Sequence, residues 1–218
     1  MSIRRPFELL SNPVPVFHLT GKNTALVVMD VQRFATRSGM LAEIAERKGV
    51  LSEFAEYFQL LEESFAEIHI LLDVFHKKGI KVIFTRYKPL MTNGSDFCAQ
   101  IRARGHTFGG TSEEGEFLPN LNPRAEDIVI DKTCDNPFNC TSIDTILSQV
   151  GVKNLVVCGV RCPGTVDTFA LDAADREYGV IIASDAVAGA VRGCASNLAG
   201  GLIRVRSTTA ILEMIENL

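Results

Sequence analysis

Three polar features of the sequence each follow a stretch that predicts a strand, and together they could hydrolyse a carbonyl compound. They are Asp30, Lys132 and the turn at 159–165. The ends of parallel strands meet at one edge of a sheet, where ligands bind. There Asp30 would relay a proton and Lys132 would stabilise negative charge. Backbone N–H groups of Arg161 and Thr165 would receive the oxyanion.

Cys162 is one candidate nucleophile in this turn. A helical pattern leaves the turn, bounded by Pro163 near its start and Gly179 just past its end. The positive end of that helix favours an ionised thiol. Because Pro163 favours an extended conformation for Cys162, the sulfur could point toward the site. The alternative is a small, half-buried thiol without a chemical role.

Thr165 is the other candidate nucleophile. Its hydroxyl must lose a proton to a base during attack. Asp30 is the evident base, and a carboxylate near Lys132 is expected to be a weak one. We therefore favour the alternative that Thr165 caps the helix and supplies its N–H group. Whether the turn carries a working nucleophile stays open at this point.

An alternation of predicted strands and helices would position these residues. Strands are expected at 24–29, 81–85, 127–131, 154–158, 180–183 and 203–206, and helices at 50–78, 141–150, 164–178, 194–202 and from 209. Strands that alternate with helices indicate an α/β fold. The expected architecture is a doubly wound, mostly parallel sheet of about six strands with helices on both faces.

The chain is expected to form a single domain over 1–218, because it has no internal repeat, low-complexity tract or Pro/Ser-rich linker. Residues 1–22 are expected to form an irregular arm, because prolines there interrupt regular structure. Residues 88–123 lack clear periodicity and contain several glycines. Since long loops in compact domains are often functional, we interpret this segment as a substrate-side loop.

Composition and charge indicate a soluble globular protein. Of the 218 residues, 46% are hydrophobic and 22% are charged, with a formal net charge of −4. This charge gives no reason to expect a nucleic acid or an anionic membrane as partner. No apolar run approaches the roughly 18 residues that a membrane helix needs. The N-terminal residues lack the apolar stretch of a secretory signal, and the six cysteines are expected to be reduced, so we expect a cytoplasmic protein.

Several short motifs, in this order along the chain, resemble the isochorismatase-like, or cysteine hydrolase, superfamily. The motifs are Leu26-Val27-Val28-Met29-Asp30-Val31-Gln32, Gly115-Glu116-Phe117-Leu118-Pro119, Asp127-Ile128-Val129-Ile130-Asp131-Lys132, Gly159-Val160 and Ser184-Asp185-Ala186. The resemblance runs from about residue 24 to residue 186 and covers most of the chain. It implies a hydrolase with the three-layer α/β fold of that superfamily.

The resemblance also implies a catalytic triad of Asp, Lys and Cys. Asp30 and Lys132 match the first two members, whereas the cysteine position falls on Thr165. Cys162 lies three residues earlier, where the superfamily often has a threonine. The bond Val160–Arg161 matches a peptide bond that is often cis in the superfamily.

The resemblance implies neither a metal nor another cofactor. Metal-binding members of the superfamily carry an Asp-x-His and a second His between the first strand and the lysine, and the matching region here has no such spacing. His69 and His76 lie on one predicted helix, and His18 and His106 are isolated. Structural roles are therefore expected for the histidines.

The favoured function is metal-independent hydrolysis of a C–N bond in a small linear amide or ureide. Gln32 and Phe34, which follow Asp30 closely, are candidate substrate-binding residues. A first alternative is isochorismatase-type hydrolysis, in which Asp30 protonates an enol ether while water attacks. A second alternative is a catalytically silent member that binds a small molecule or serves in an assembly.

Two further expectations concern partners. A homo-oligomer, either a dimer or a tetramer, is implied by the resemblance, and the apolar stripe at 51–75 could contribute to the contact. Arg86, Arg102 and Arg104 could pair with carboxylates of a small-molecule substrate or could lie in solvent.

Overall fold

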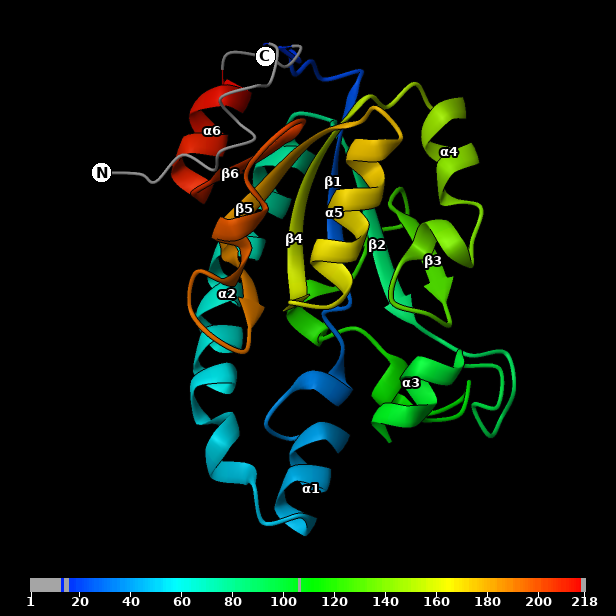
Figure 1. The fold of residues 1–218 in the computed structure, drawn as a ribbon. Coiled ribbons are helices and arrows are strands. Elements are labelled where there is room, and N and C mark those ends of the chain that lie inside the picture. The colour runs from blue at the N-terminus through cyan, green and yellow to red at the C-terminus, as the bar shows by residue number, and fades with distance from the viewer. Residues whose placement is uncertain (1–12, 14–15, 106, 217–218) are drawn as a thin grey trace.

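A six-stranded, entirely parallel sheet forms the centre of the described structure (Figure 1). The computed structural model describes residues 13, 16–105 and 107–216, so most of the predicted arm at 1–22 lies outside the described residues. The strands are β1 (Thr24–Met29), β2 (Lys81–Tyr87), β3 (Ile128–Lys132), β4 (Asn154–Cys162), β5 (Gly179–Gly189) and β6 (Ile203–Arg206), in the order β3-β2-β1-β4-β5-β6. The predicted α/β sheet is confirmed.

Helices cover both faces of the sheet, as the doubly wound prediction requires (Figure 1). They are α1 (Met40–Arg47), α2 (Ala55–Lys77), α3 (Ala99–Arg104), α4 (Ile143–Gln149), α5 (Thr165–Asp175) and α6 (Thr208–Glu216). One buried apolar cluster joins α4 and α5 to the sheet, and a second joins α2 and α6 to the opposite face.

Strand β1 shows how the sequence creates these two layers. Its six residues are all buried. Ala25, Val27 and Met29 pack into the α4–α5 cluster, whereas Leu26 and Val28 pack into the α2–α6 cluster. Successive side chains of a strand point to opposite faces, so a strand covered on both sides must be apolar throughout.

The chain turns in opposite directions from the middle of the sheet. Strand β1 lies between β2 and β4, and the connections lead outward to β3 on one side and to β6 on the other. A crevice forms outside the carboxyl ends of the two central strands at such a switch point. Asp30 follows β1, and the turn at 159–165 belongs to the end of β4 and the start of α5.

Several predicted elements need correction. The predicted helix at 194–202 is only the 3₁₀ helix Cys194–Leu198, and the predicted helix at 50–78 begins with the 3₁₀ helix η3 (Leu51–Phe54) before α2. Strand β5 extends to Gly189. Helix α1 was not predicted, and the expected loop at 88–123 contains α3. Both unpredicted helices are short, at eight and six residues, which leaves little periodicity to detect.

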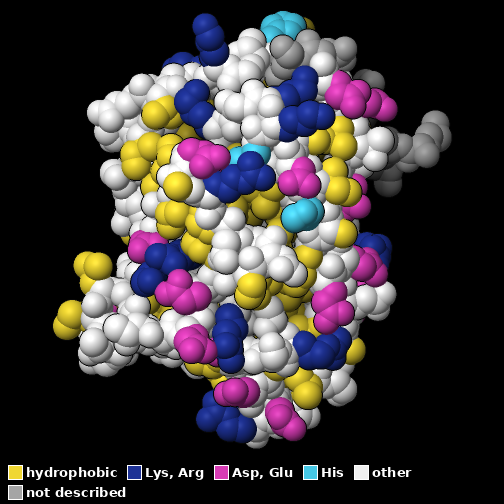
Figure 2. Space-filling view, turned by 180° about the vertical axis from the view of Figure 1, so that it is seen from behind, with side chains coloured by type: hydrophobic (Ala, Val, Ile, Leu, Met, Phe, Trp, Pro, Cys, Tyr) yellow, Lys and Arg dark blue, Asp and Glu magenta, His cyan; other side chains and the backbone are white. Residues whose placement is uncertain are grey.

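Acidic and basic side chains are mixed over the face shown in Figure 2, rather than gathered in a patch of one sign. Among the helices of the described residues, none is long and apolar enough to cross a membrane. All six cysteines are free thiols.

Gly159 allows the close approach of β4 to β1 at the switch point. It has a φ of 111°, and a Cβ atom there would overlap the backbone of Met29. We therefore expect Gly159→Ala to lower the free energy of unfolding by about 3 kcal/mol, because the cost of backbone strain and the cost of steric overlap with Met29 add together. Urea denaturation measures the loss.

The matched control for this prediction is Gly151→Ala. Gly151 also has a positive φ, of 74°, but a Cβ atom added there would meet no heavy atom within 4 Å. The control should cost about 1 kcal/mol, since only the backbone strain remains. Equal losses in the two variants would contradict the role of close approach at Gly159.

Candidate active site

Asp30 lies at the carboxyl end of β1 with its carboxylate buried. Its φ is 53°, an uncommon value for a residue with a side chain, and its backbone N–H donates to the Thr85 carbonyl at 3.0 Å. The Thr85 hydroxyl donates to Asp30 Oδ1 at 2.9 Å. The neighbouring strand β2 thus holds both the backbone and the side chain of Asp30.

Lys132 forms a buried ion pair with Asp30. Its Nζ lies 2.9 Å from Asp30 Oδ2, and the two side chains are 0% and 1% exposed. The same ammonium donates to the Cys134 carbonyl at 3.0 Å and lies 3.3 Å from the centroid of the Tyr87 ring. These contacts compensate part of the cost of removing the cation from water.

Burial raises the pKa of the Asp30 carboxyl above its usual value. The charge of Lys132, together with hydrogen bonds from Lys132, Thr85 and Thr165, opposes this effect without cancelling it. A carboxylate with a raised pKa is a stronger base than an exposed one. Lys132 lowers the pKa of Asp30, as expected, but burial has the larger and opposite effect.

Tyr87 connects this pair to a second buried carboxylate. Its hydroxyl donates to Asp135 Oδ1, and Arg104 donates to the two oxygens of Asp135 at 2.8 and 2.7 Å. Burial raises the pKa of Asp135, but hydrogen bonds from Arg104 and Tyr87 outweigh it and hold the pKa below its ordinary value. Burial, followed by the charges of Asp30 and Asp135, keeps the pKa of Tyr87 well above its usual range. The phenol therefore stays protonated.

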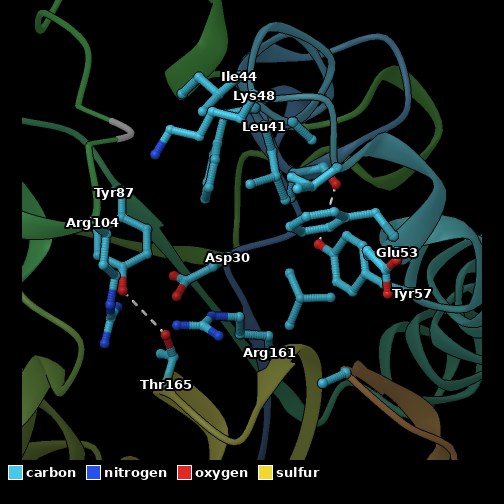
Figure 3. Close-up of a pocket in the computed structure, with 17 residues that line it drawn as sticks. Asp30, Leu41, Ile44, Lys48, Glu53, Tyr57, Tyr87, Arg104, Arg161 and Thr165 are labelled. Carbon is cyan, nitrogen blue, oxygen red and sulfur yellow. Dashed lines mark hydrogen bonds between the residues drawn. The ribbon is translucent and has the colours of Figure 1, made fainter.

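Thr165 is the first residue of α5 and lines the same cavity as Asp30. Its Oγ1 lies 3.2 Å from the Tyr87 hydroxyl oxygen, and the residue is 2% exposed. The N-cap of α5 is Gly164, whose N–H donates to the Asp167 carboxylate. The expectation that Thr165 caps the helix therefore needs correction, since its hydroxyl faces Tyr87 and Asp30 instead (Figure 3).

Cys162 occupies a different environment. It is 1% exposed, belongs to the α4–α5 apolar cluster, and is absent from the lining of the cavity that holds Asp30. A hydrogen bond with Cys194, followed by burial, raises the pKa of the Cys162 thiol. A protonated thiol is a poor nucleophile, so this placement gives no support to a covalent role.

Gln32 and Phe34 have different surroundings. The Gln32 side chain donates to the carbonyls of Tyr87 and Gly115 at 2.9 and 2.7 Å and accepts from the Tyr87 N–H at 2.8 Å. It joins β2 to the 88–123 segment and does not line the cavity. Phe34 does line the cavity, next to Ala35.

The cavity has a volume of about 630 Å³, within the range of small-molecule sites. Figure 3 shows Asp30 among Tyr87, Thr165 and Arg161, with Leu41 and Ile44 contributed by α1 and Tyr57 by α2. It is lined by Asp30, Phe34, Ala35, Leu41, Ile44, Ala45, Lys48, Val50, Glu53, Phe54, Tyr57, Tyr87, Arg104, Val160, Arg161, Thr165 and Ala190.

The three arginines considered from the sequence lie apart from one another. Arg86 pairs with Asp131 and Glu116 at 2.6 and 2.9 Å and does not line the cavity, and Arg102 donates to backbone carbonyls outside it. Arg104 does line the cavity, on the predicted substrate-side segment.

The lining also contains residues that the sequence analysis missed. Tyr87 at the end of β2 could have been found from its position at a strand end, like Asp30. The α1 residues gave no such signal. The bond Val160–Arg161 is cis, as expected, and Cys162–Pro163 is also cis. No group of three or more His, Cys, Asp or Glu side chains in the described part of the chain could hold a metal ion.

Comparison with known proteins agrees with this geometry. The model of the isochorismatase domain matches residues 24–197. The chain belongs to the isochorismatase family. It is 26% identical over 194 residues to the ureidoacrylate amidohydrolase RutB of Agrobacterium fabrum (strain C58 / ATCC 33970), with 82% of this chain and 81% of that protein covered.

Solved structures of isochorismatase-like proteins share the fold. A cysteine hydrolase from Pseudomonas syringae pv. phaseolicola 1448A superposes with a TM-score of 0.77 at 24% identity, covering 95% of this chain and 99% of that one. An N-carbamoylsarcosine amidase from Thermoplasma acidophilum superposes with a TM-score of 0.67 at 21% identity, covering 85% and 96%.

Lys132→Met tests the energetic role of the buried pair. Removing the cation leaves the Asp30 carboxylate buried without its compensating charge, so we expect the free energy of unfolding at neutral pH to fall by about 3–5 kcal/mol. Urea denaturation measures the loss. It should shrink as the pH is lowered, because protonation of Asp30 removes the uncompensated charge.

Lys153→Met is the matched control, because Lys153 is exposed in the sequence segment before β4. It should change the free energy of unfolding by less than about 0.5 kcal/mol. A Lys132→Met variant as stable as this control would contradict the proposal that the stability of the fold depends on the Asp30–Lys132 pair.

Proposed function

We propose that this isochorismatase-family chain is a hydrolase that cleaves the C–N bond of an amide or ureide, with Thr165 in place of a cysteine as nucleophile. The observation that carries the proposal is that Thr165 lines the same cavity as Asp30, which forms a buried ion pair with Lys132. The amidohydrolase and amidase names of the two relatives support the choice of bond.

Two features support Thr165 as the attacking group. It lines the same cavity as Asp30, whose raised pKa suits that carboxylate to accept a proton. It also begins α5, where the first N–H groups of a helix lack intrahelical acceptors and carry a partial positive charge. Those N–H groups, with that of Arg161, would stabilise an oxyanion.

The reaction then has two halves. Thr165 Oγ1 attacks the carbonyl carbon while its proton passes to Asp30, and the C–N bond breaks as Asp30 returns that proton to the leaving nitrogen. Water next attacks the resulting ester and gives a proton to Asp30, which passes it to the Thr165 oxygen as the acid leaves. Lys132 keeps the carboxylate oriented, and the Tyr87 hydroxyl oxygen, which lies 3.2 Å from Thr165 Oγ1, positions the threonine before attack.

A second function has its own supporting observation. A carboxyl group with a raised pKa can also donate a proton, as the enol-ether hydrolysis of an isochorismate-like compound would require. In that reaction Asp30 acts in its protonated form and water attacks directly. Thr165 then needs no nucleophilic role.

Substitutions of Thr165 test the nucleophile. Thr165→Ala should lower kcat/KM by about 10²-fold or more, and Thr165→Ser should keep most of the activity. Thr165→Cys should raise activity above the natural chain, because a thiol at a helix N-terminus beside a lysine ionises readily. Steady-state hydrolysis of an amide and ureide panel, beginning with ureidoacrylate, measures these effects.

Thr168→Ala is the matched control, since Thr168 lies on α5 and donates to the Gly164 carbonyl at 2.8 Å without lining the cavity. It should leave kcat/KM within about threefold. A fully active Thr165→Ala variant would exclude the covalent route and favour direct attack by water.

The pH profile separates the two functions. As a base, Asp30 must be ionised, so kcat/KM should rise with pH through a midpoint above the ordinary value of 3.8. As an acid toward an enol ether, Asp30 must be protonated, so activity should fall with pH through the same midpoint. Hydrolysis of a ureide and of isochorismate across acid and neutral pH provides the measurement, with Asp30→Asn expected to be inactive in both.

A further inference from the structure

The cavity is not uniformly polar, and its two parts have different chemistry. Asp30, Thr165 and Tyr87 form one polar wall (Figure 3). The rest is dominated by apolar side chains from the segment that contains α1 and η3, which include Ile44 and Phe54. Lys48 and Glu53 are the charged residues that this segment adds to the lining. A small linear ureide would leave most of this apolar surface in contact with water.

The apolar part is built into the fold. Phe54 packs edge to face against the Tyr57 ring, with centroids 6.2 Å apart, and the Tyr57 hydroxyl donates to the Ala35 carbonyl at 3.1 Å. Leu41 packs against the buried cluster that contains Phe34. Ile44 is half-buried and lines the cavity, but it is not among the members of that cluster. Its side chain is therefore available to a ligand.

Arg161 provides a cation at the border between the two parts. Its guanidinium extends toward Asp30 and Thr165 in Figure 3, and its positive charge also acts on Tyr57. Arg104 on the same cavity already pairs with Asp135. Within the described residues, by contrast, no carboxylate lies within salt-bridge distance of Arg161. A free guanidinium is suited to bidentate recognition of a carboxylate.

We propose that the substrate carries a bulky apolar group, bound between α1 and η3, together with a carboxylate that pairs with Arg161. The cavity volume of about 630 Å³ accommodates both beside the scissile bond. The part of the proposal that concerns cleavage rests on the proposed C–N hydrolysis, whereas the binding preference does not.

Three probe ligands isolate the two groups. N-carbamoylphenylalanine has a ureide, a carboxylate and a benzyl group; N-carbamoylglycine lacks the benzyl group; and 2-phenylethylurea lacks the carboxylate. Affinities are measured by isothermal titration calorimetry on the Thr165→Ala variant, so that the ligand is not consumed. We expect N-carbamoylphenylalanine to bind about tenfold or more tightly than either of the other two.

Two variants with matched controls assign the preference to residues. Ile44→Asn should reduce the affinity that the benzyl group adds. Ile70→Asn is its matched control, because Ile70 lies on α2 and is 41% exposed, and it should leave that affinity unchanged. Arg161→Gln should abolish the gain from the carboxylate. Arg47→Gln should not, because Arg47 is exposed on α1 and does not line the cavity. Circular dichroism checks that each variant is folded.

The outcomes separate this proposal from the proposed reaction. Equal affinities for the three ligands would overturn it, whatever the turnover of the natural chain. A second result would also overturn it: Ile44→Asn leaves the ligand preference unchanged but weakens self-association in sedimentation experiments. In that case a second copy of the chain would cover the apolar part of the cavity. A retained preference without turnover of any ureide supports the binding proposal and contradicts C–N hydrolysis.

Discussion

The buried ion pair between Asp30 and Lys132 is the interaction on which the site depends. Both side chains are almost fully excluded from solvent, with 2.9 Å between Nζ and Oδ2. Neither charge would be tolerated there alone, because the desolvation of an unpaired ion costs several kcal/mol. The surrounding contacts, which include the Thr85 hydroxyl, the Cys134 carbonyl and the Tyr87 ring, hold the pair in one arrangement.

The topology of the sheet explains why the pair can form at all. Lys132 comes from the edge strand β3, and Asp30 from β1, with β2 between them. Residues near the carboxyl ends of these parallel strands reach the same edge of the sheet, and β2 contributes Tyr87 and Thr85 to the gap. Strand β4 on the other side of β1 then brings Thr165 to the same point. The polar residues at this edge of the sheet thus come from the ends of four strands.

The helices beyond the edge of the sheet make one part of the cavity apolar. Helix α1 and the 3₁₀ helix η3 add an apolar wall to a polar centre, while Arg161 lies between the two parts. The polar centre suits hydrolysis of a carbonyl compound, as expected of an isochorismatase-family member. The apolar wall is where members of a fold family can differ in substrate, since function depends on the site rather than on the fold.

The sequence alone predicted the layered α/β fold, because buried strands such as β1 carry continuous apolar runs. It also drew attention to Asp30 and Lys132, because both lie at the carboxyl end of a predicted strand. It did not reveal α1 and α3, whose short lengths leave weak periodicity. Only the tertiary structure distinguishes the surroundings of Thr165 and Cys162. Three residues apart in one turn, they face a polar cavity and an apolar core, respectively. The direction in which each side chain points is set by the path of the backbone and by packing between segments that are distant in the sequence. The spacing of residues within the turn encodes neither.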